Sequence, residues 1–209
     1  MELEKMAQIA SELLSGKRSH PYKEIGNKYY HGLRTAKLAV TLRKLILPGD
    51  DSHDDILTAA AWFHDCTNGD SNHCRTGSEY CRTALKGLCT DAELEEICHI
   101  ILVHDDRTHK VEYSPWIKLH QDADHLDHFG SYDVMMAFLE SNAHDRTIDD
   151  MTKWFLEMRP GQRDKVKAQL NYDISRRIYD EKTDFMVKFG ERFKAECDGE
   201  IVTDEIYNI

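Results

Sequence analysis

The 209-residue sequence lacks an excess of positive charge and lacks long hydrophobic runs. It carries 27 Lys and Arg against 38 Asp and Glu, and the formal net charge of −11 argues against binding to a nucleic-acid backbone or an anionic membrane surface. The longest nearly apolar run, Ile56 to Phe63, is too short to cross a bilayer. The amino terminus, MELEKMAQIASELL, has no apolar signal core, and we therefore expect a cytoplasmic protein.

Paired cysteines and phosphate-binding loops are also missing. None of the six cysteines forms a Cys-x-x-Cys pair, which favours free thiols over disulfides or a structural zinc site built from these cysteines. The chain has no Gly-x-x-x-x-Gly-Lys-Ser/Thr loop and no Gly-x-Gly-x-x-Gly after a strand, which disfavours two large classes of nucleotide-binding protein.

Helix breakers are scarce, with 4 Pro and 11 Gly that fall between periodic segments. No stretch alternates polar and apolar residues as a half-buried strand does, so we predict an all-α fold with one domain over residues 1–209. The more charged part, 145–209, is predicted to be a set of appended helices. The predicted helices cover residues 2–15, 22–47, a segment capped by Asp51 and Ser52 that ends near Cys66, 76–88, 91 to about 105 behind a Thr90–Glu93 capping box, 115 to about 129, 131–142, 148–158, 162–170 and 173–197.

Histidines and carboxylates gather where apolar helical patterns pass or end. His31 shares a helical face with Thr35 and Leu42 and should point inward, as a metal ligand or as an ordinary core histidine. His64-Asp65 ends the most apolar helix, where an ionised Asp is unfavourable unless it is paired, bound to a metal or turned into solvent.

Two further segments add candidates. In the segment from His120 to His128, Asp122 and Asp124 lie on opposite sides of an apolar stripe, and the helical wheel does not choose between them. His104, followed by two Asp, ends another apolar helix and is either a site residue or part of a polar helix terminus.

Imidazoles and carboxylates in this combination suit a divalent ion such as Mn, Fe, Co, Ni, Zn or Mg. Such an ion would neutralise the charge of a phosphate and lower the pKa of a water molecule, which supplies a nucleophile near neutral pH. It would also offset the repulsion between an acidic protein and an anionic substrate.

The ordered set resembles the HD-domain superfamily of metal-dependent phosphohydrolases, with the likeness covering about residues 25–140. His31 matches the first His of the family pattern, and His64-Asp65 matches its doublet. The segment from Gln121 to Leu126 matches the last motif with Asp124, not Asp122, as the ligand. The resemblance implies a helical bundle of the HD-domain type with extra C-terminal helices.

The resemblance also implies roles. It assigns one divalent ion to His31, His64, Asp65 and Asp124, and it leaves room for a second ion near His73, His99 or His104. Asn68 and His73 resemble a continuation of the doublet found in small bacterial and archaeal members, and with Asp127 they are predicted to bind substrate. The predicted catalytic residues are Asp65 to orient water, His104 to protonate the leaving group and Arg34, in a His-x-x-Arg form, to hold a phosphate oxygen.

We therefore predict a hydrolase that cleaves a small-molecule phosphomonoester or phosphodiester, which includes nucleotides. A non-catalytic nucleotide sensor, a di-iron oxygenase on an HD-like fold and a helical structural protein remain alternatives. A cysteine nucleophile at Cys66 is disfavoured because no third, orienting residue can be named. The Gly-Tyr-Pro motif of cyclic-dinucleotide phosphodiesterases is absent.

Overall fold

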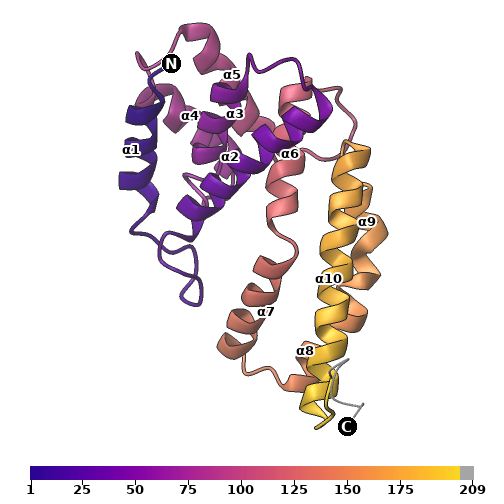
Figure 1. Ribbon diagram of the computed structural model, residues 1–209. Helices are drawn as coiled ribbons and strands as arrows, with labels where there is room; N and C mark the ends of the chain where they lie inside the picture. The colour runs from indigo at the N-terminus through magenta and orange to yellow at the C-terminus, as the bar shows by residue number, and fades with distance from the viewer. Residues whose placement is uncertain (203–209) are drawn as a thin grey trace. The chain divides into compact units, whose positions relative to one another are not determined.

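A computed structural model of the chain describes residues 1–202, and within this range it is helical without any strand, which confirms the all-α prediction. No helix in the described range is long and apolar enough to cross a membrane. The elements, drawn in Figure 1, are α1 (Leu3–Leu14), α2 (Asn27–Ile46), α3 (Asp54–Phe63), α4 (His73–Ala84), α5 (Asp91–Val103), α6 (Pro115–Asp127), α7 (Ser131–Ala143), α8 (Ile148–Lys153), the π-helix η1 (Trp154–Met158), the 3-10 helix η2 (Pro160–Gln162), α9 (Arg163–Lys167) and α10 (Asp173–Cys197).

The chain divides into two compact units. The first unit contains Met1–Asp127 together with Gln169–Ser175, and the second contains His128–Ala168 together with the described residues 176–202. The first unit therefore holds α1 to α6, every predicted metal ligand and the first turn of α10.

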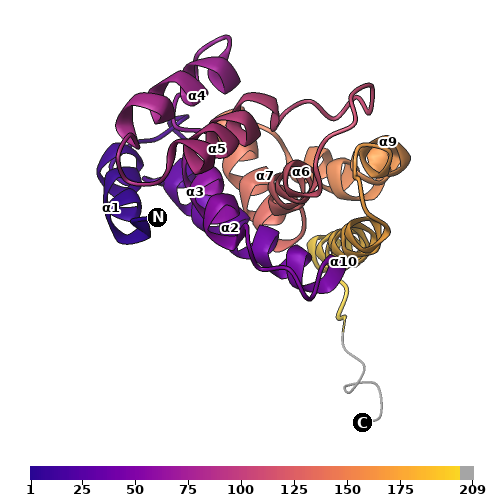
Figure 2. The ribbon, with the colours of Figure 1, turned by 90° about the horizontal axis from the view of Figure 1, so that it is seen from above.

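The core of the first unit is built around α3. Because α3 is apolar on nearly every side, its residues Leu57, Ala59, Ala60, Ala61 and Phe63 are almost fully buried. α2 packs beside α3, and Figures 1 and 2 show the two helices side by side from two directions. α2 also packs on α6, and α4 packs on α5.

A glycine allows α2 and α3 to approach closely. A Cβ atom at Gly32 would lie 2.8 Å from the carbonyl oxygen of Ala61 and 3.2 Å from the Cα of Trp62. Because Gly32 follows His31 and Ala61 precedes His64 by one helical turn, this contact brings the two histidines toward each other.

Several predicted helix boundaries are wrong for identifiable reasons. The helix predicted over 22–47 begins only at Asn27, because Gly26 takes a left-handed conformation with a φ of +75°. Asp51 and Ser52 do not cap α3, since the Ser52 hydroxyl donates to Asp50 instead and the helix begins at Asp54. The helix predicted over 76–88 runs from His73 to Ala84 and ends before Gly87, whose φ is +82°.

Other helix boundaries predicted from local sequence patterns are confirmed. Thr90 and Glu93 form the predicted capping box at the start of α5, and Pro115 is the first residue of α6. α1, α7 and α10 match their predicted ranges to within about a residue.

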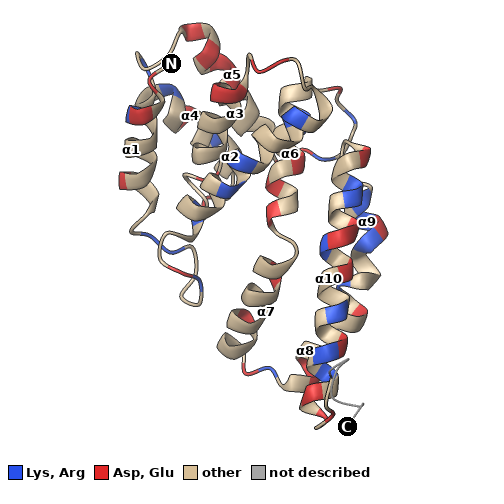
Figure 3. Cartoon of the chain, viewed as in Figure 1, with Lys and Arg blue, Asp and Glu red and all other residues tan. Residues whose placement is uncertain are grey.

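The second unit has its own core of aromatic side chains. Phe155 is fully buried and packs with Phe138, Phe189 and Phe193. The helix predicted over 148–158 instead changes to a π-helix at Trp154, whose carbonyl accepts from the backbone N–H of Arg159 at 3.0 Å. Of the helix predicted over 162–170, the part Arg163–Lys167 is α-helical and forms the short α9, which follows the 3-10 helix Pro160–Gln162. Figure 3 shows charges of both signs along α10.

Candidate metal centre

Four predicted metal ligands converge in the first unit. His31 comes from the second turn of α2, His64 and Asp65 follow the last turn of α3, and Asp124 lies in α6. The Nε2 atoms of His31 and His64 are 3.1 Å apart. Asp124 Oδ1 lies 3.0 Å from His31 Nε2 and 3.5 Å from His64 Nε2. Asp65 Oδ2 lies 3.8 Å and 3.6 Å from the same two atoms.

The other ring nitrogen of each histidine is already bonded. His64 Nδ1–H donates to the carbonyl oxygen of Ala61 at 2.9 Å, and His31 Nδ1–H donates to Asp127 Oδ2 at 2.7 Å. Both acceptors are oxygens without a proton, so each Nδ1 must carry the hydrogen and each Nε2 is directed at the shared centre. This is the outer-shell arrangement that fixes histidine ligands in metal sites.

The carboxylates of the cluster favour a positive charge at its centre. Although burial alone lowers it, the hydrogen bonds to Asp124 and Asp127 raise the pKa of His31 to about 9. Burial works against ionisation of Asp65 as well, yet the neighbouring His64 and Lys28 hold the pKa of its carboxyl well below its usual range. Without a metal, the cluster holds a proton at the position where a cation would sit.

The residues present fit a divalent ion. Ligand atoms about 2.1 Å from an ion are separated by roughly 3.0 Å in octahedral and roughly 3.4 Å in tetrahedral geometry. The separations among the nitrogen and Asp124 oxygen atoms run from 3.0 to 3.5 Å, and all four side chains are buried. A set of two imidazole nitrogens and two carboxylate oxygens suits Mn, Fe, Co, Ni or Zn better than a ligand set of oxygens alone would.

The structure distinguishes the roles of Asp122 and Asp124, the two carboxylates between which the helical wheel does not choose. Asp122 accepts from the backbone N–H of Asn171 at 2.8 Å, from the Asn171 side chain at 2.9 Å and from the backbone N–H of Tyr172 at 3.1 Å. Asp122 therefore anchors the returning chain at the start of α10, while Asp124 faces His31 and His64.

Arg34 and Asp127 lie on the side of His31 that faces away from the shared centre. Arg34 donates from Nε to Asp127 Oδ1 at 2.8 Å and from Nη2 to Asp127 Oδ2 at 2.9 Å, and Asp127 in turn accepts from His31. The predicted role of Asp127 in substrate binding does not fit this geometry, because its carboxylate is buried and occupied by His31 and Arg34. The pair instead positions His31.

The remaining predicted residues lie on the side of Asp65. Asn68 donates from Nδ2 to Asp65 Oδ1 at 3.1 Å, and His73 Nε2 lies 3.8 Å from the same oxygen. His99 is not part of this cluster, since it lines a surface pocket with His53 and Trp116.

His104 is placed near the centre. Its ring centroid lies 5.0 Å from that of His64, and its Nδ1–H donates to the carbonyl oxygen of Ile101 at 2.7 Å. Burial lowers the pKa of His104, so the neutral ring presents Nε2 as an acceptor. A ring that donates from Nδ1 can protonate a leaving group only when Nε2 also carries a hydrogen, and the general-acid role of His104 stays a prediction.

Three neighbouring residues were not predicted. Lys28 forms an ion pair with Asp65, and Arg107 forms one with Asp124. Helical spacing could have indicated Lys28, because it shares a face of α2 with His31, three residues later. Arg107 lies in an irregular segment, where no periodicity indicates the direction of a side chain. His120 is fully buried, its ring centroid lies 5.3 Å from that of His64, and neither of its ring nitrogens has a hydrogen-bond partner within residues 1–202.

Comparison with solved structures identifies the fold of the chain. No protein-family model and no curated protein matches the chain. Among solved structures, an HD-superfamily hydrolase from Bacillus thuringiensis matches with a TM-score of 0.65 and 21% identity over 95% of this chain and 97% of its own. The chain has the HD-domain fold.

Two structures of Bacillus subtilis YpgQ show the same HD-domain fold. YpgQ in complex with ADP matches with a TM-score of 0.65 and 19% identity over 93% of this chain and 94% of its own. A second YpgQ structure matches with a TM-score of 0.65 and 22% identity over 95% and 99%.

Proposed function

We propose that this HD-domain protein is a divalent-metal-dependent hydrolase that cleaves a phosphate ester. The observation that carries the proposal is the convergence of His31 Nε2, His64 Nε2 and Asp124 Oδ1 within 3.0–3.5 Å of one another, with Asp65 beside them. A divalent ion held there would lower the pKa of a water molecule and neutralise phosphate charge.

The surrounding residues supply orientation and charge. Asp65 is fixed from two sides, by the side-chain amide of Asn68 and by the ammonium group of Lys28. A carboxylate held in this way can orient a water molecule through the oxygen that is not used as a ligand. Asp127 and Arg34 hold the ring of His31 in the ligating orientation.

The cations around the centre favour an anionic substrate. Lys28 and Arg107 each contact one of the carboxylate ligands, and both side chains are mostly buried at the centre. A bound ion would share the charge of these carboxylates, and the ammonium and guanidinium groups would then be available to phosphate oxygens. We propose a nucleoside phosphate as the substrate class, supported by the similarly folded YpgQ that was crystallised with ADP.

The test is hydrolysis of a panel of nucleoside phosphates and simpler phosphate esters, measured with Mn²⁺ and after removal of metal with a chelator. We expect turnover that requires the ion and is lost in Asp65→Ala. Asp55→Ala, which removes an exposed carboxylate from the first turn of α3, should retain turnover. Metal binding by the wild type without hydrolysis of any panel member would overturn the proposal and favour a nucleotide sensor.

A further inference from the structure

The first unit contains a second His-Asp doublet with the same local geometry as the first. His104-Asp105 follows the end of α5 as His64-Asp65 follows the end of α3. Each histidine caps its helix and donates from Nδ1 to the carbonyl oxygen three residues earlier, at 2.7 Å for His104 and 2.9 Å for His64. The second doublet is therefore pre-oriented, with its Nε2 directed away from its own helix.

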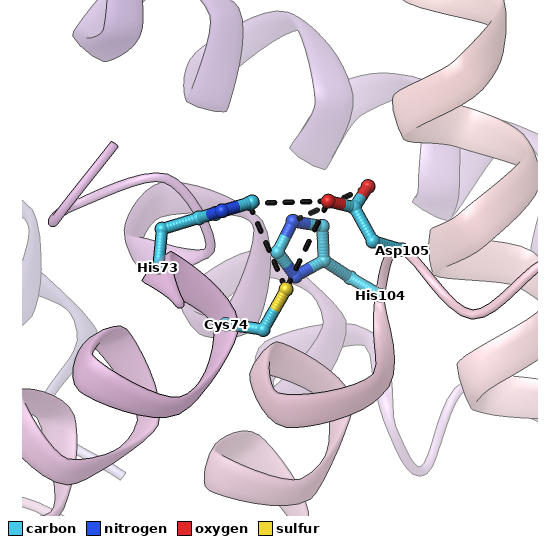
Figure 4. A group of neighbouring side chains, drawn as sticks. All are labelled: His73, Cys74, His104 and Asp105. Atoms are coloured by element: carbon cyan, nitrogen blue, oxygen red, sulfur yellow. Dashed lines mark hydrogen bonds and ion pairs between the residues drawn. The ribbon is translucent and has the colours of Figure 1, made fainter. Parts of the chain in front are cut away.

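The first turn of α4 faces this doublet with two more donors. His73 and Cys74 are the first two residues of α4, and Figure 4 shows their side chains directed toward His104 and Asp105. His73 Nε2 lies 3.2 Å from Asp105 Oδ2, and Cys74 Sγ lies 3.7 Å from His73 Nε2 and 3.8 Å from Asp105 Oδ2. His104 Nε2 lies 3.8 Å from Asp105 Oδ1.

We propose that His73, Cys74, His104 and Asp105 form a second metal site, with a thiolate ligand, for a zinc-type ion. The four ligand atoms all lie within 4.8 Å of one another. In a tetrahedral zinc site, with bonds of about 2.0–2.3 Å, neighbouring ligand atoms are roughly 3.3–3.7 Å apart. The 3.2–3.8 Å separations among His73 Nε2, Cys74 Sγ and Asp105 Oδ2 are close to these values. One sulfur, two imidazole nitrogens and one carboxylate oxygen match the ligand preference of Zn²⁺ and differ from the two-nitrogen, two-oxygen set of the first centre.

Ion entry and proton balance are both consistent with this site. The Asp105 side chain is 47% exposed, so an ion can enter from solvent, whereas His104 closes the inner side with 2% exposure. Binding of the ion releases the thiol proton of Cys74 to solvent as the metal–sulfur bond forms.

The second site lies next to the first without sharing its proposed ligands. His73 Nε2 is 3.8 Å from Asp65 Oδ1, and the rings of His64 and His104 are 5.0 Å apart. Because the ligand sets differ, occupancy of the second site can be measured whether or not the first centre is catalytic.

The experiment is a cobalt titration of the metal-free protein, followed by absorption spectroscopy and elemental analysis. A Co²⁺ ion bound to a thiolate gives an intense sulfur-to-metal charge-transfer band in the near ultraviolet. We expect the wild type to show this band and Cys74→Ser to lose it together with one equivalent of metal. Cys66→Ser and Cys197→Ser, which remove thiols outside the proposed ligand set, should keep it. A wild type that binds cobalt without the band, or a band that disappears in Cys66→Ser, would overturn the proposal.

A second variant separates the two centres. Asp124→Asn removes a ligand of the first centre only, so the charge-transfer band should remain while one equivalent of metal is lost. Circular dichroism establishes that the variant is folded. Loss of the band in a folded Asp124→Asn protein would show that no independent second site exists.

Discussion

His31 and His64 direct their Nε2 atoms at each other across 3.1 Å from two helices that touch at Gly32 and Ala61. The approach of the backbones and the meeting of the imidazoles are parts of one arrangement, because Gly32 directly follows His31. Any side chain at position 32 must push α3 away from α2. The proposed metal centre therefore requires glycine at position 32, although this residue supplies no ligand atom.

Gly32→Ala is expected to destabilise the protein by about 1–3 kcal/mol, since the new Cβ would lie 2.8 Å from the carbonyl oxygen of Ala61. It should also weaken metal binding, because the displaced α3 carries His64 away from His31. Urea unfolding and calorimetric titration with Mn²⁺ measure the two effects. Gly16→Ala is the matched control, since nothing lies within 4 Å of its Cβ position, and it should change stability by less than about 0.5 kcal/mol. Equal behaviour of the two variants would contradict the close-approach argument.

Asp127→Asn is expected to lower metal affinity by roughly 10–100-fold while leaving the four proposed ligands in place. The amide can no longer accept from His31 and Arg34 with a full negative charge, and the ring of His31 loses the partner that fixes its orientation. Calorimetric titration with Mn²⁺ measures the affinity. Asp133→Asn disrupts a comparable carboxylate–arginine pair, with Arg159 in the second unit, and should leave the affinity unchanged. Unchanged affinity in Asp127→Asn would show that Asp127 does not position His31.

Asp122→Ala and Asp124→Ala should have different consequences although the two residues are one half-turn apart. Removal of Asp122 leaves the half-buried backbone N–H groups of Asn171 and Tyr172 without their acceptor, at a combined cost on the order of 1–3 kcal/mol. Removal of Asp124 should abolish metal binding at the first centre. Thermal unfolding and metal titration of both variants separate the roles, and loss of metal from Asp122→Ala with unchanged stability would reverse our assignment.

The same two residues show what the sequence could predict. The apolar stripe predicted a buried helix in this segment, but it left Asp122 and Asp124 equivalent, and only the resemblance to HD-domain proteins favoured Asp124. The partner of Asp122 is Asn171, 49 residues away in the sequence. No local periodicity indicates which distant segment returns to a helix face.

Local signals predicted some boundaries and failed at others. The Thr90–Glu93 capping box was predicted correctly, because both hydrogen bonds lie within four residues of sequence. The start of α2 was not, because the left-handed turn at Gly26 is tied to Lys17, whose carbonyl oxygen accepts from the Gly26 N–H at 2.7 Å. Arg107 was missed because it reaches Asp124 from an irregular segment, where spacing carries no information about direction.

The metal-free protein should lose stability as the pH rises from about 6.5 to about 9. The pKa of His31 is raised from 6.5 to about 9 in the folded state, so its proton stabilises the fold fully below about pH 6.5, and this contribution disappears as the pH rises through 9. Because a tenfold gain in proton affinity corresponds to about 1.4 kcal/mol, the contribution to the free energy of unfolding is on the order of 3 kcal/mol.

Urea unfolding of chelator-treated wild type and His31→Asn across this pH range isolates the effect, because the other titrating groups are common to both proteins. The free energy of unfolding of the wild type should fall toward that of the variant as the pH rises. A difference between the two proteins that stays constant with pH would contradict the raised pKa. Saturating Mn²⁺ should remove the alkaline loss in the wild type, since the ion then supplies the positive charge between Asp124 and His64 that the proton supplied before.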